Sequence, residues 1–281
     1  MKRIVLSLSL TAIILSGCNE KPALDSEREV VVHFSEHLLS SFLKSTASED
    51  EKVIDRLILY SVNDLDAVEN VYDELAPTLS GGIALTLPRR VKTLYAVANP
   101  SDELAAATPA NLSQLTALTE GFATAPQSPF LMSGKGNIIG NTVTIELVRA
   151  VAKFRIIGEG GFQIQSVTVE NASPKGYVFA QHPFSVPADA KIDDYLEINS
   201  TDPVFYIAES ALDSQPKFVV SGLLASTTVD YTIVQLTKGG NAIDILRNTY
   251  YEITITPSDG NFTITVNIPD WEDAEIDEII F

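Results

Sequence analysis

The sequence predicts a mainly β protein made of two tandem β-sandwich domains, the N-terminal one with short helices. From Phe162 onward, short runs rich in Val, Ile, Thr, Tyr and Phe alternate with turn residues, which is typical of a sandwich. In the first half, strand patterns alternate with helix patterns. Between the halves, residues 141–158 change the phase of their apolar alternation, which indicates a change of hydrophobic core.

Residues 1–17 have the features of a lipoprotein signal peptide. Lys2 and Arg3 precede an apolar run of a dozen residues, and small residues follow that run. Such a run is too short to span a bilayer as a helix. The next residue, Cys18, is the single cysteine of the chain, which excludes an internal disulfide and a thiolate zinc site.

Residues 18–52 are expected to hold a tether, a first strand and an exposed loop. In REVVVHF, residues 28–34, the side chains of Val30, Val32 and Phe34 share one face, as in a half-buried strand. The later run STASEDEK is small and charged, so it favours an exposed loop of the kind that proteases cut.

The N-terminal sandwich is predicted to span residues 53–158 and to be completed by the first strand. Residues 53–62, VIDRLILYSV, indicate a buried strand, and DAVENVYDELA (66–76) an amphipathic helix. Residues 90–100 form a predicted strand that ends at Asn99-Pro100, and Ser101 can cap a following helix.

Residues 141–158, NTVTIELVRAVAKFRIIG, decide the architecture. Apolar residues occupy odd positions up to Leu147 and even positions from Val148 to Ile156. Such a strand must bulge, or serve one core with its first half and another with its second. Either arrangement predicts a hinge, and the glycines of GEGG, which no helix pattern follows, place the domain boundary near residue 158.

The C-terminal sandwich is predicted to span residues 159–281. Its expected strands are QIQSVTV, PVFYIAE, PKFVVSG, VDYTIVQL, NTYYEITI and NFTITVNI. The turn TPSDGN between the last two indicates a hairpin.

Composition and motifs argue against several function classes. The net charge of −18 makes nucleic acid a poor partner. HFSEH places His33 and His37 at the wrong spacing for a metal helix, and His182 is an isolated loop residue, so no metal and no cofactor is expected. No nucleophile elbow, phosphate loop or calcium loop is present, so we predict no enzymatic activity.

Two further groups of residues have a structural and a functional interpretation. Arg149, Lys153 and Arg155 lie on one face of the 141–158 segment, where they either pair with acidic residues or form a receptor-facing patch. The aromatic residues Tyr177, Phe179 and Phe184 either pack in the core or form an exposed binding platform.

Several segments, in order, resemble the fimbrillin (type V pilin) family of Bacteroidales and its anchor and tip relatives. They are the lipobox LSGC, the pair EREVVVHF and DEKVIDRLILYSV, LYAVAN, LMSG before IELVRAVAKFRI, FYIAES, ILRNTYYEITI and VNIPDW. The resemblance implies transthyretin-like sandwiches, lipidation of Cys18 with palmitate, a location on the outer membrane and in extracellular fimbriae, and other fimbrial subunits as partners.

The resemblance also implies how such a subunit would assemble. A protease would cut after a basic residue in the loop behind the first strand, and a strand of a neighbouring subunit would then fill the vacated groove. In this chain the cleaved peptide bond would be the one between Lys44 and Ser45. The shaft subunits of the family more often have arginine before the cleaved bond. The tail contains Ile276, Ile279, Ile280 and Phe281, which could enter a groove as a donor strand or could fray.

The role within this family stays open at the level of the sequence. A shaft subunit is cut near Lys44, an anchor keeps lipidated Cys18 and its first strand, and a tip subunit accepts a strand without donating one. The alternative is a monomeric surface lipoprotein that binds glycans or host proteins. A hydrolase on the same scaffold has no motif in its favour.

Overall fold

The computed structural model describes residues 26–35, 49–75, 77, 79–122, 125–188, 191–258 and 261–269. Its strands confirm the prediction of a mainly β protein with a sandwich-like arrangement of sheets. The strands are β1 (Glu27–Phe34), β2 (Arg56–Asn63), β3 (Val68–Leu75), β4 (Ile83–Pro88), β5 (Val91–Ala98), β6 (Thr119–Gly121), β7 (Met132–Asn137), β8 (Thr142–Ile145), β9 (Val148–Arg149), β10 (Val151–Gly158), β11 (Phe162–Glu170), β12 (Lys175–Tyr177), β13 (Leu196–Asn199), β14 (Val204–Ala208), β15 (Lys217–Leu224), β16 (Thr227–Ile233), β17 (Thr237–Lys238), β18 (Asn241–Ala242), β19 (Tyr250–Ser258) and β20 (Asn261–Asn267). The short helices are η2 (Glu49–Lys52, 3-10), α2 (Asp102–Ala105) and α3 (Leu112–Thr116).

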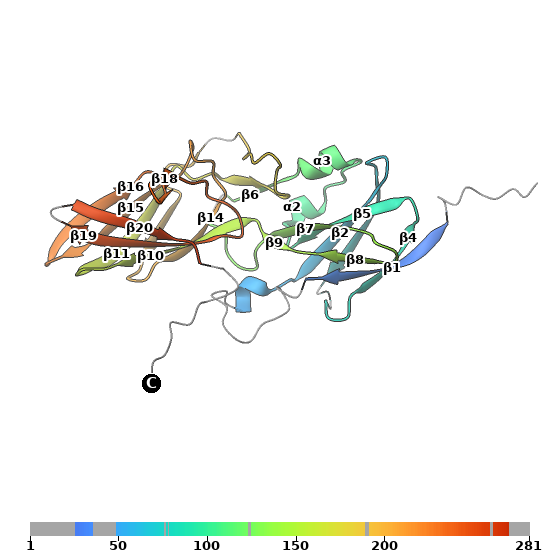
Figure 1. The fold of residues 1–281 in the computed structure, drawn as a ribbon, viewed down its shortest axis with the longest axis horizontal. Helices are drawn as coiled ribbons and strands as arrows, with labels where there is room; N and C mark the ends of the chain where they lie inside the picture. Colours follow the sequence, from blue (N-terminus) through green and yellow to red (C-terminus); the bar gives the residue numbers. More distant parts are fainter. Residues whose placement is uncertain are drawn as a thin grey trace, which may run out of the picture.

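One lobe of this elongated molecule contains β1 to β5 and β7 to β9, whereas β6 pairs with β12 between the lobes (Figure 1). A five-stranded sheet, β3-β2-β5-β7-β9, packs on a three-stranded sheet, β4-β1-β8, and a buried apolar cluster fills the space between them. Strands β2 and β5 are buried on both faces, because Leu57 and Leu59 belong to this cluster whereas Ile58 and Tyr60 belong to another. This explains why residues 57–62 read as an almost continuous apolar run.

The other lobe encloses a buried cluster that is rich in aromatic side chains. Its sheets are β14-β10-β19-β20 and β13-β11-β15-β16, with alternate residues of both turned inward. Phe154 stacks between Tyr251 and Phe205, at centroid distances of 5.0 Å and 5.4 Å. All six strands predicted in this half are present, and β19 pairs with β20 up to Ser258 and Asn261, as the hairpin prediction requires.

The segment 141–158 serves several cores in succession. Val143 and Ile145 of β8 are buried in the N-terminal lobe, Val151 belongs to the cluster between the lobes, and Phe154 of β10 lies in the C-terminal core. The second of the two interpretations of its phase change therefore holds. Strand β10 pairs with β14 and β19, so it hydrogen-bonds within the C-terminal lobe. The domain boundary near residue 158 stays a prediction.

The predicted helix over residues 66–76 is wrong, because β3 occupies most of that segment. Its residues pair with β2 from Arg56↔Leu75 to Val62↔Val68. The helical pattern of this segment favours a helix, but β2 is a buried strand whose backbone groups on this side need partners. Pairing with β3 satisfies them and outweighs the local helix preference. The predicted cap is confirmed: the N–H of Leu104 donates to Oγ of Ser101 at 3.2 Å.

Candidate functional site

The first strand occupies the middle of a three-stranded sheet (Figure 1). β1 pairs antiparallel with β4, from Glu27↔Pro88 to Val32↔Ile83, and parallel with β8, from Val31↔Thr142 to Phe34↔Ile145. Both backbone edges of β1 are thus hydrogen-bonded. Its removal would leave β4 and β8 with facing unpaired edges.

The inward face of β1 is fully desolvated. Val30 and Val32 are 0% exposed and Phe34 is 4% exposed, as the alternation of the sequence predicts. They belong to the same buried cluster as Leu57, Leu59 and residues of β5. We call the space beneath β1, together with the edges of β4 and β8, the first-strand slot. Burial of the three side chains stabilises the fold by about 5–9 kcal/mol, an upper estimate because the unfolded chain is itself partly compact.

Polar contacts fix the start of β1. The guanidinium of Arg28 donates from Nη1 to the carbonyl of Gly140 at 2.9 Å and from Nη2 to that of Val91 at 2.8 Å. Gly82, with φ of +85°, lets the chain before β4 approach β1, since a Cβ there would lie 2.8 Å from Cγ1 of Val31. Arg28 therefore fixes the register at the N-terminal end of the slot, and Gly82 lies against the second half of β1.

A polar cluster lies where the two lobes meet, just after residues 36–48. Glu51 of η2 is 2% exposed and pairs with Nζ of Lys153 at 2.8 Å. The hydroxyl of Tyr206 also donates to the carboxylate of Glu51, and Nε of Arg149 donates to the Glu51 carbonyl at 3.1 Å. We call these four residues the junction cluster. It attaches η2 to β10 and β14.

A second buried ion pair lies in the same region. Arg247 is bonded to both carboxylate oxygens of Glu209, and its Nη1 donates to the carbonyl of Val178 at 2.8 Å. Both partners are buried. The guanidinium of Arg247 thus meets an opposite charge and a backbone carbonyl, as the burial of a charge requires.

Burial changes the acidity of tyrosines in and near the junction. Desolvation, followed by the bond to Glu51, raises the pKa of Tyr206 far above its ordinary value. Burial raises the pKa of Tyr195 to about 12, and its hydroxyl donates to the carbonyl of Phe122 at 3.0 Å. These phenols therefore stay neutral donors at physiological pH.

The basic residues singled out in the sequence are paired. Lys153 binds Glu51, and Nε of Arg155 lies 2.7 Å from Oδ1 of Asp202. Arg149 is buried in the junction, with Nη1 3.3 Å from Oδ1 of Asn248. The ion-pairing interpretation therefore holds for Lys153 and Arg155, whereas Arg149 is buried against carbonyl and amide oxygens and does not face a receptor. Glu51, which sequence reasoning placed in an exposed loop, is the residue that this reasoning missed.

The other predicted site residues fall into two groups. Cys18, Lys44, Ser45, His37 and the tail residues Ile276, Ile279, Ile280 and Phe281 lie outside the described residues. Of the remaining ones, His33 is exposed on β1 and His182 lies in an exposed bend. Phe179 is buried against Tyr95, and Tyr177 and Phe184 are half-buried, so these aromatic residues form no exposed platform.

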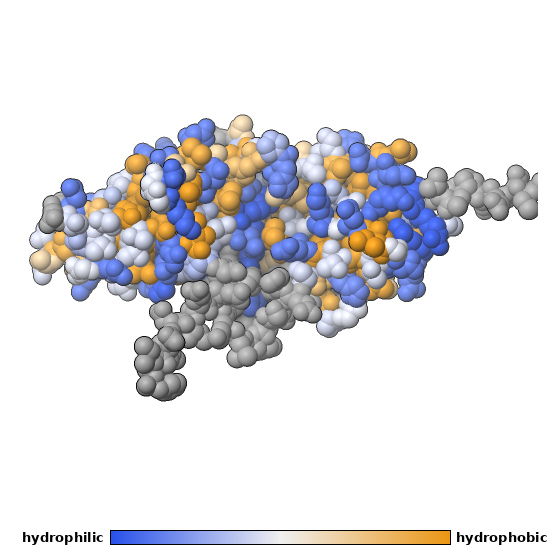
Figure 2. Space-filling model, viewed as in Figure 1, coloured by the Kyte–Doolittle hydropathy of each residue, from blue (hydrophilic) through white to orange (hydrophobic). Residues whose placement is uncertain are grey.

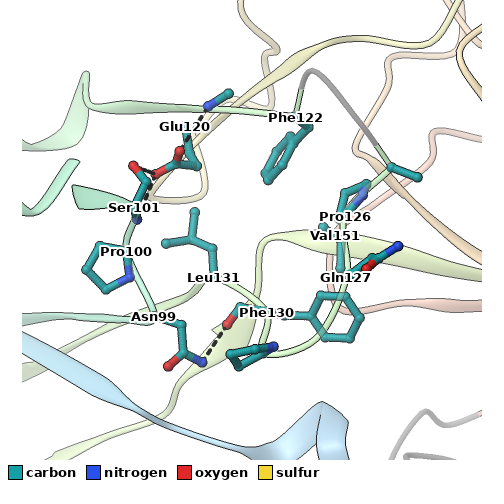
Figure 3. Close-up of a pocket in the computed structure, with 13 residues that line it drawn as sticks. Asn99, Pro100, Ser101, Glu120, Phe122, Pro126, Gln127, Phe130, Leu131 and Val151 are labelled. Atoms are coloured by element: carbon teal, nitrogen blue, oxygen red, sulfur yellow. Dashed lines mark hydrogen bonds between the residues drawn. The ribbon is translucent and has the colours of Figure 1, made fainter. Parts of the chain in front are cut away.

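Two surface cavities flank the segment 125–130. One, of about 550 Å³, is lined by Asn99, Glu120, Phe122 and neighbouring residues (Figure 3), and the carboxylate of Glu120 accepts a bond from Ser101 at 2.9 Å. The other, of about 350 Å³, borders Glu51 and Tyr206.

Among the described residues, no group of three or more His, Cys, Asp or Glu side chains is arranged to hold a metal ion. Within the same residues, no helix has the length and apolar character needed to cross a membrane.

Solved structures share this fold. A candidate cell adhesion protein from Bacteroides eggerthii is 17% identical, with a TM-score of 0.63 over 87% of this chain and 96% of that one. Another from Parabacteroides distasonis is 19% identical, with a TM-score of 0.62 over 89% and 98%. The C-terminally truncated tip fimbrial protein Mfa3 of Porphyromonas gingivalis is 14% identical, with a TM-score of 0.60 over 88% and 100%.

A search of curated proteins finds no match. Residues 46–277 match the family model described as fimbrillin-A associated anchor proteins Mfa1 and Mfa2. This match covers most of the chain, from η2 to the end of β20, and leaves out β1. The chain therefore belongs to the family of fimbrillin-A associated anchor proteins.

Proposed function

We propose that the chain is a non-enzymatic structural subunit of cell-surface fimbriae, exported as a lipoprotein through Cys18. Family membership supports a fimbrial role, and other fimbrial subunits are then the partners. The observation that carries the proposal is the first-strand slot, since β1 is the middle strand of its sheet and its inward residues are fully buried.

In the assembly step, cleavage after Lys44 releases β1 together with Cys18. The vacated slot then exposes apolar side chains between two unpaired strand edges, and a strand of a neighbouring subunit satisfies both. A donor must place apolar residues at alternate positions, as Val30, Val32 and Phe34 do. The tail residues Ile276, Ile279, Ile280 and Phe281 are the proposed donor of this chain.

A fimbrial anchor is the second candidate, favoured by the description of the matching family. In that role Lys44 stays uncut, Cys18 keeps its lipid in the outer membrane, and β1 remains in the slot. The junction cluster fits this role as well, because it fixes Glu51 next to the segment that joins β1 to the rest of the lobe.

Shearing the cell surface and sequencing the N-terminus of this chain by mass spectrometry tests the proposal. A start at Ser45 in ladder-forming polymer supports the shaft subunit, and an acylated Cys18 attached to intact β1 supports the anchor. Recovery of the chain solely as a free monomer would exclude a fimbrial role. A Lys44→Gln variant, with Lys52→Gln as its control, should block processing if Lys44 is the site.

A further inference from the structure

One end of the N-terminal lobe is built from three turns and the start of β1. The turns join β2 to β3, β4 to β5 and β7 to β8. Backbone bonds connect Asp64 to the carbonyl of Arg90, Arg89 to that of Ser26, and Ile138 to that of Lys92. We call this surface, residues 63–67, 88–92 and 138–141 with the start of β1, the end face. It lies where β1 begins (Figure 1).

The end face presents two aliphatic side chains to solvent. Leu65 is 84% exposed and Ile139 is 79% exposed, more than any other large hydrophobic residue that the structure describes. The fold holds them in this position, because Oδ1 of Asn63 accepts a bond from the N–H of Leu65 and Ile139 exchanges backbone bonds with Thr142. Both side chains thus belong to turns whose backbone is hydrogen-bonded, so their exposure is a feature of the folded surface.

Charges around them are close to balanced, although the chain as a whole carries −18. Arg28, Arg89, Arg90 and Lys92 stand beside Glu27, Asp64, Asp66 and Glu69. Arg90 pairs with Glu69, whereas the side chains of Arg89 and Lys92 are exposed. Hydrophilic residues dominate this end of the molecule (Figure 2). It is therefore suited to a polar layer that contains phosphate, more than to hydrocarbon.

The position of β1 relates the end face to the proposed lipid. Ser26 follows Cys18 by eight positions, and even a fully extended chain over those eight steps spans at most about 26–29 Å. The backbone of Ser26 is bonded to Arg89 of the end face. A lipid on Cys18, which is part of the proposed function and stays in place in the anchor role, would hold this end close to the bilayer surface.

We propose that the end face is a membrane-docking surface that contacts the lipid headgroup layer. Leu65 and Ile139 enter the interface and Arg89 and Lys92 meet lipid phosphates, while the C-terminal lobe points away from the membrane. Two aliphatic residues beside acids bind a bilayer too weakly to recruit a free protein. Tethering raises their effective concentration at the surface, so weak contacts suffice to orient the molecule.

The test uses the single cysteine. Residues 18–281 are coupled through Cys18 to maleimide lipids in vesicles of phosphatidylcholine and phosphatidylglycerol, in a Trp271→Phe background. A reporter is introduced as Leu65→Trp, as Ile139→Trp or, as a matched control in the C-terminal lobe, as Val234→Trp, where the native side chain is 64% exposed. Lipids with a nitroxide on the headgroup then quench tryptophans at the interface.

We expect loss of most of the emission at positions 65 and 139 and little loss at position 234. Arg89→Glu combined with Lys92→Glu should restore much of the emission. Equal quenching at all three positions, or quenching at 234 alone, would overturn the proposal. Because coupling is chemical, this result is independent of lipidation in cells, which the mass of the exported chain tests separately.

Discussion

The first-strand slot and the junction are both buried, but different forces hold them together. In the slot, β1 contributes three aliphatic or aromatic side chains and two ladders of backbone hydrogen bonds. At the junction, the ion pairs Glu51–Lys153 and Glu209–Arg247 are enclosed by apolar residues. Apolar burial is non-directional and backbone pairing does not depend on side-chain identity, so any strand with the right apolar alternation can make both. A buried ion pair needs its charged partners in one geometry.

This difference indicates which part of the molecule can be exchanged and which part must stay fixed. In the proposed assembly step, a strand leaves the slot and another replaces it without a specific side-chain partner. η2, which follows the segment after β1, is held by charge pairs that a replacement strand does not supply. The two lobes should therefore keep their relative position while the slot is emptied and refilled.

The largest expected effect follows from removing one partner of a junction pair. Glu209→Ala leaves Arg247 buried beside backbone carbonyls without its counter-charge, so the free energy of unfolding should fall by about 3–5 kcal/mol. Chemical denaturation measures this loss. The matched control Asp202→Ala, which removes the exposed partner of Arg155, should cost about 0–1 kcal/mol. If both variants lost the same free energy of unfolding, the buried ion pair at the junction would stabilise the fold no more than an exposed one.

A somewhat smaller loss is expected in the slot. Phe34→Ala leaves a cavity beneath the end of β1 and should lower the free energy of unfolding by about 3 kcal/mol. His33→Ala alters the exposed face of the same strand and should stay within about 0.5 kcal/mol of the native protein. If both variants behaved alike in denaturation, β1 would not be held by its inward face.

The smallest effect concerns pH. The pKa of Tyr206 is raised above its ordinary value of 10.0, so the folded state holds this proton more tightly than the unfolded chain. The resulting stabilisation is complete below about pH 10 and is lost as the pH rises toward the folded pKa, by up to about 1.4 kcal/mol per pH unit. Tyr206→Phe should give a shallower alkaline decline in denaturation midpoints. The control Phe34→Ala removes no ionisable group, so its stability should fall with rising pH as steeply as that of the native protein. If the stability of Tyr206→Phe also fell as steeply, Tyr206 would not be the source of the alkaline decline.

Local pattern predicted the elements in which one face is buried. The alternation of Val30, Val32 and Phe34 is preserved in β1, and the phase change after Leu147 marks the passage between cores. Ser101 caps α2 because the N-cap preference is a property of the residue and its neighbours. These features depend on short stretches of chain, so the sequence contains the information that they need.

Features that depend on distant partners could not be predicted in this way. Residues 68–75 have a helical period, but β2 supplies the edge that draws them into a sheet. Glu51 lies in a run of small and charged residues, and its burial depends on Lys153, a hundred residues away along the chain, and on Tyr206. A buried carboxylate has no local signature, since its partners come together through the fold.

Strand exchange in the slot tests the central claim most directly. A specific protease site inserted between Lys44 and Ser45 of the full chain allows β1 to be cut free from the rest of the folded protein. A labelled peptide of residues 26–35 should then enter the slot in place of β1 with the fold unchanged, and the same peptide with Val30→Asp and Val32→Asp should fail to enter. Release of the first strand without uptake of the native peptide, or equal uptake of both peptides, would contradict the account.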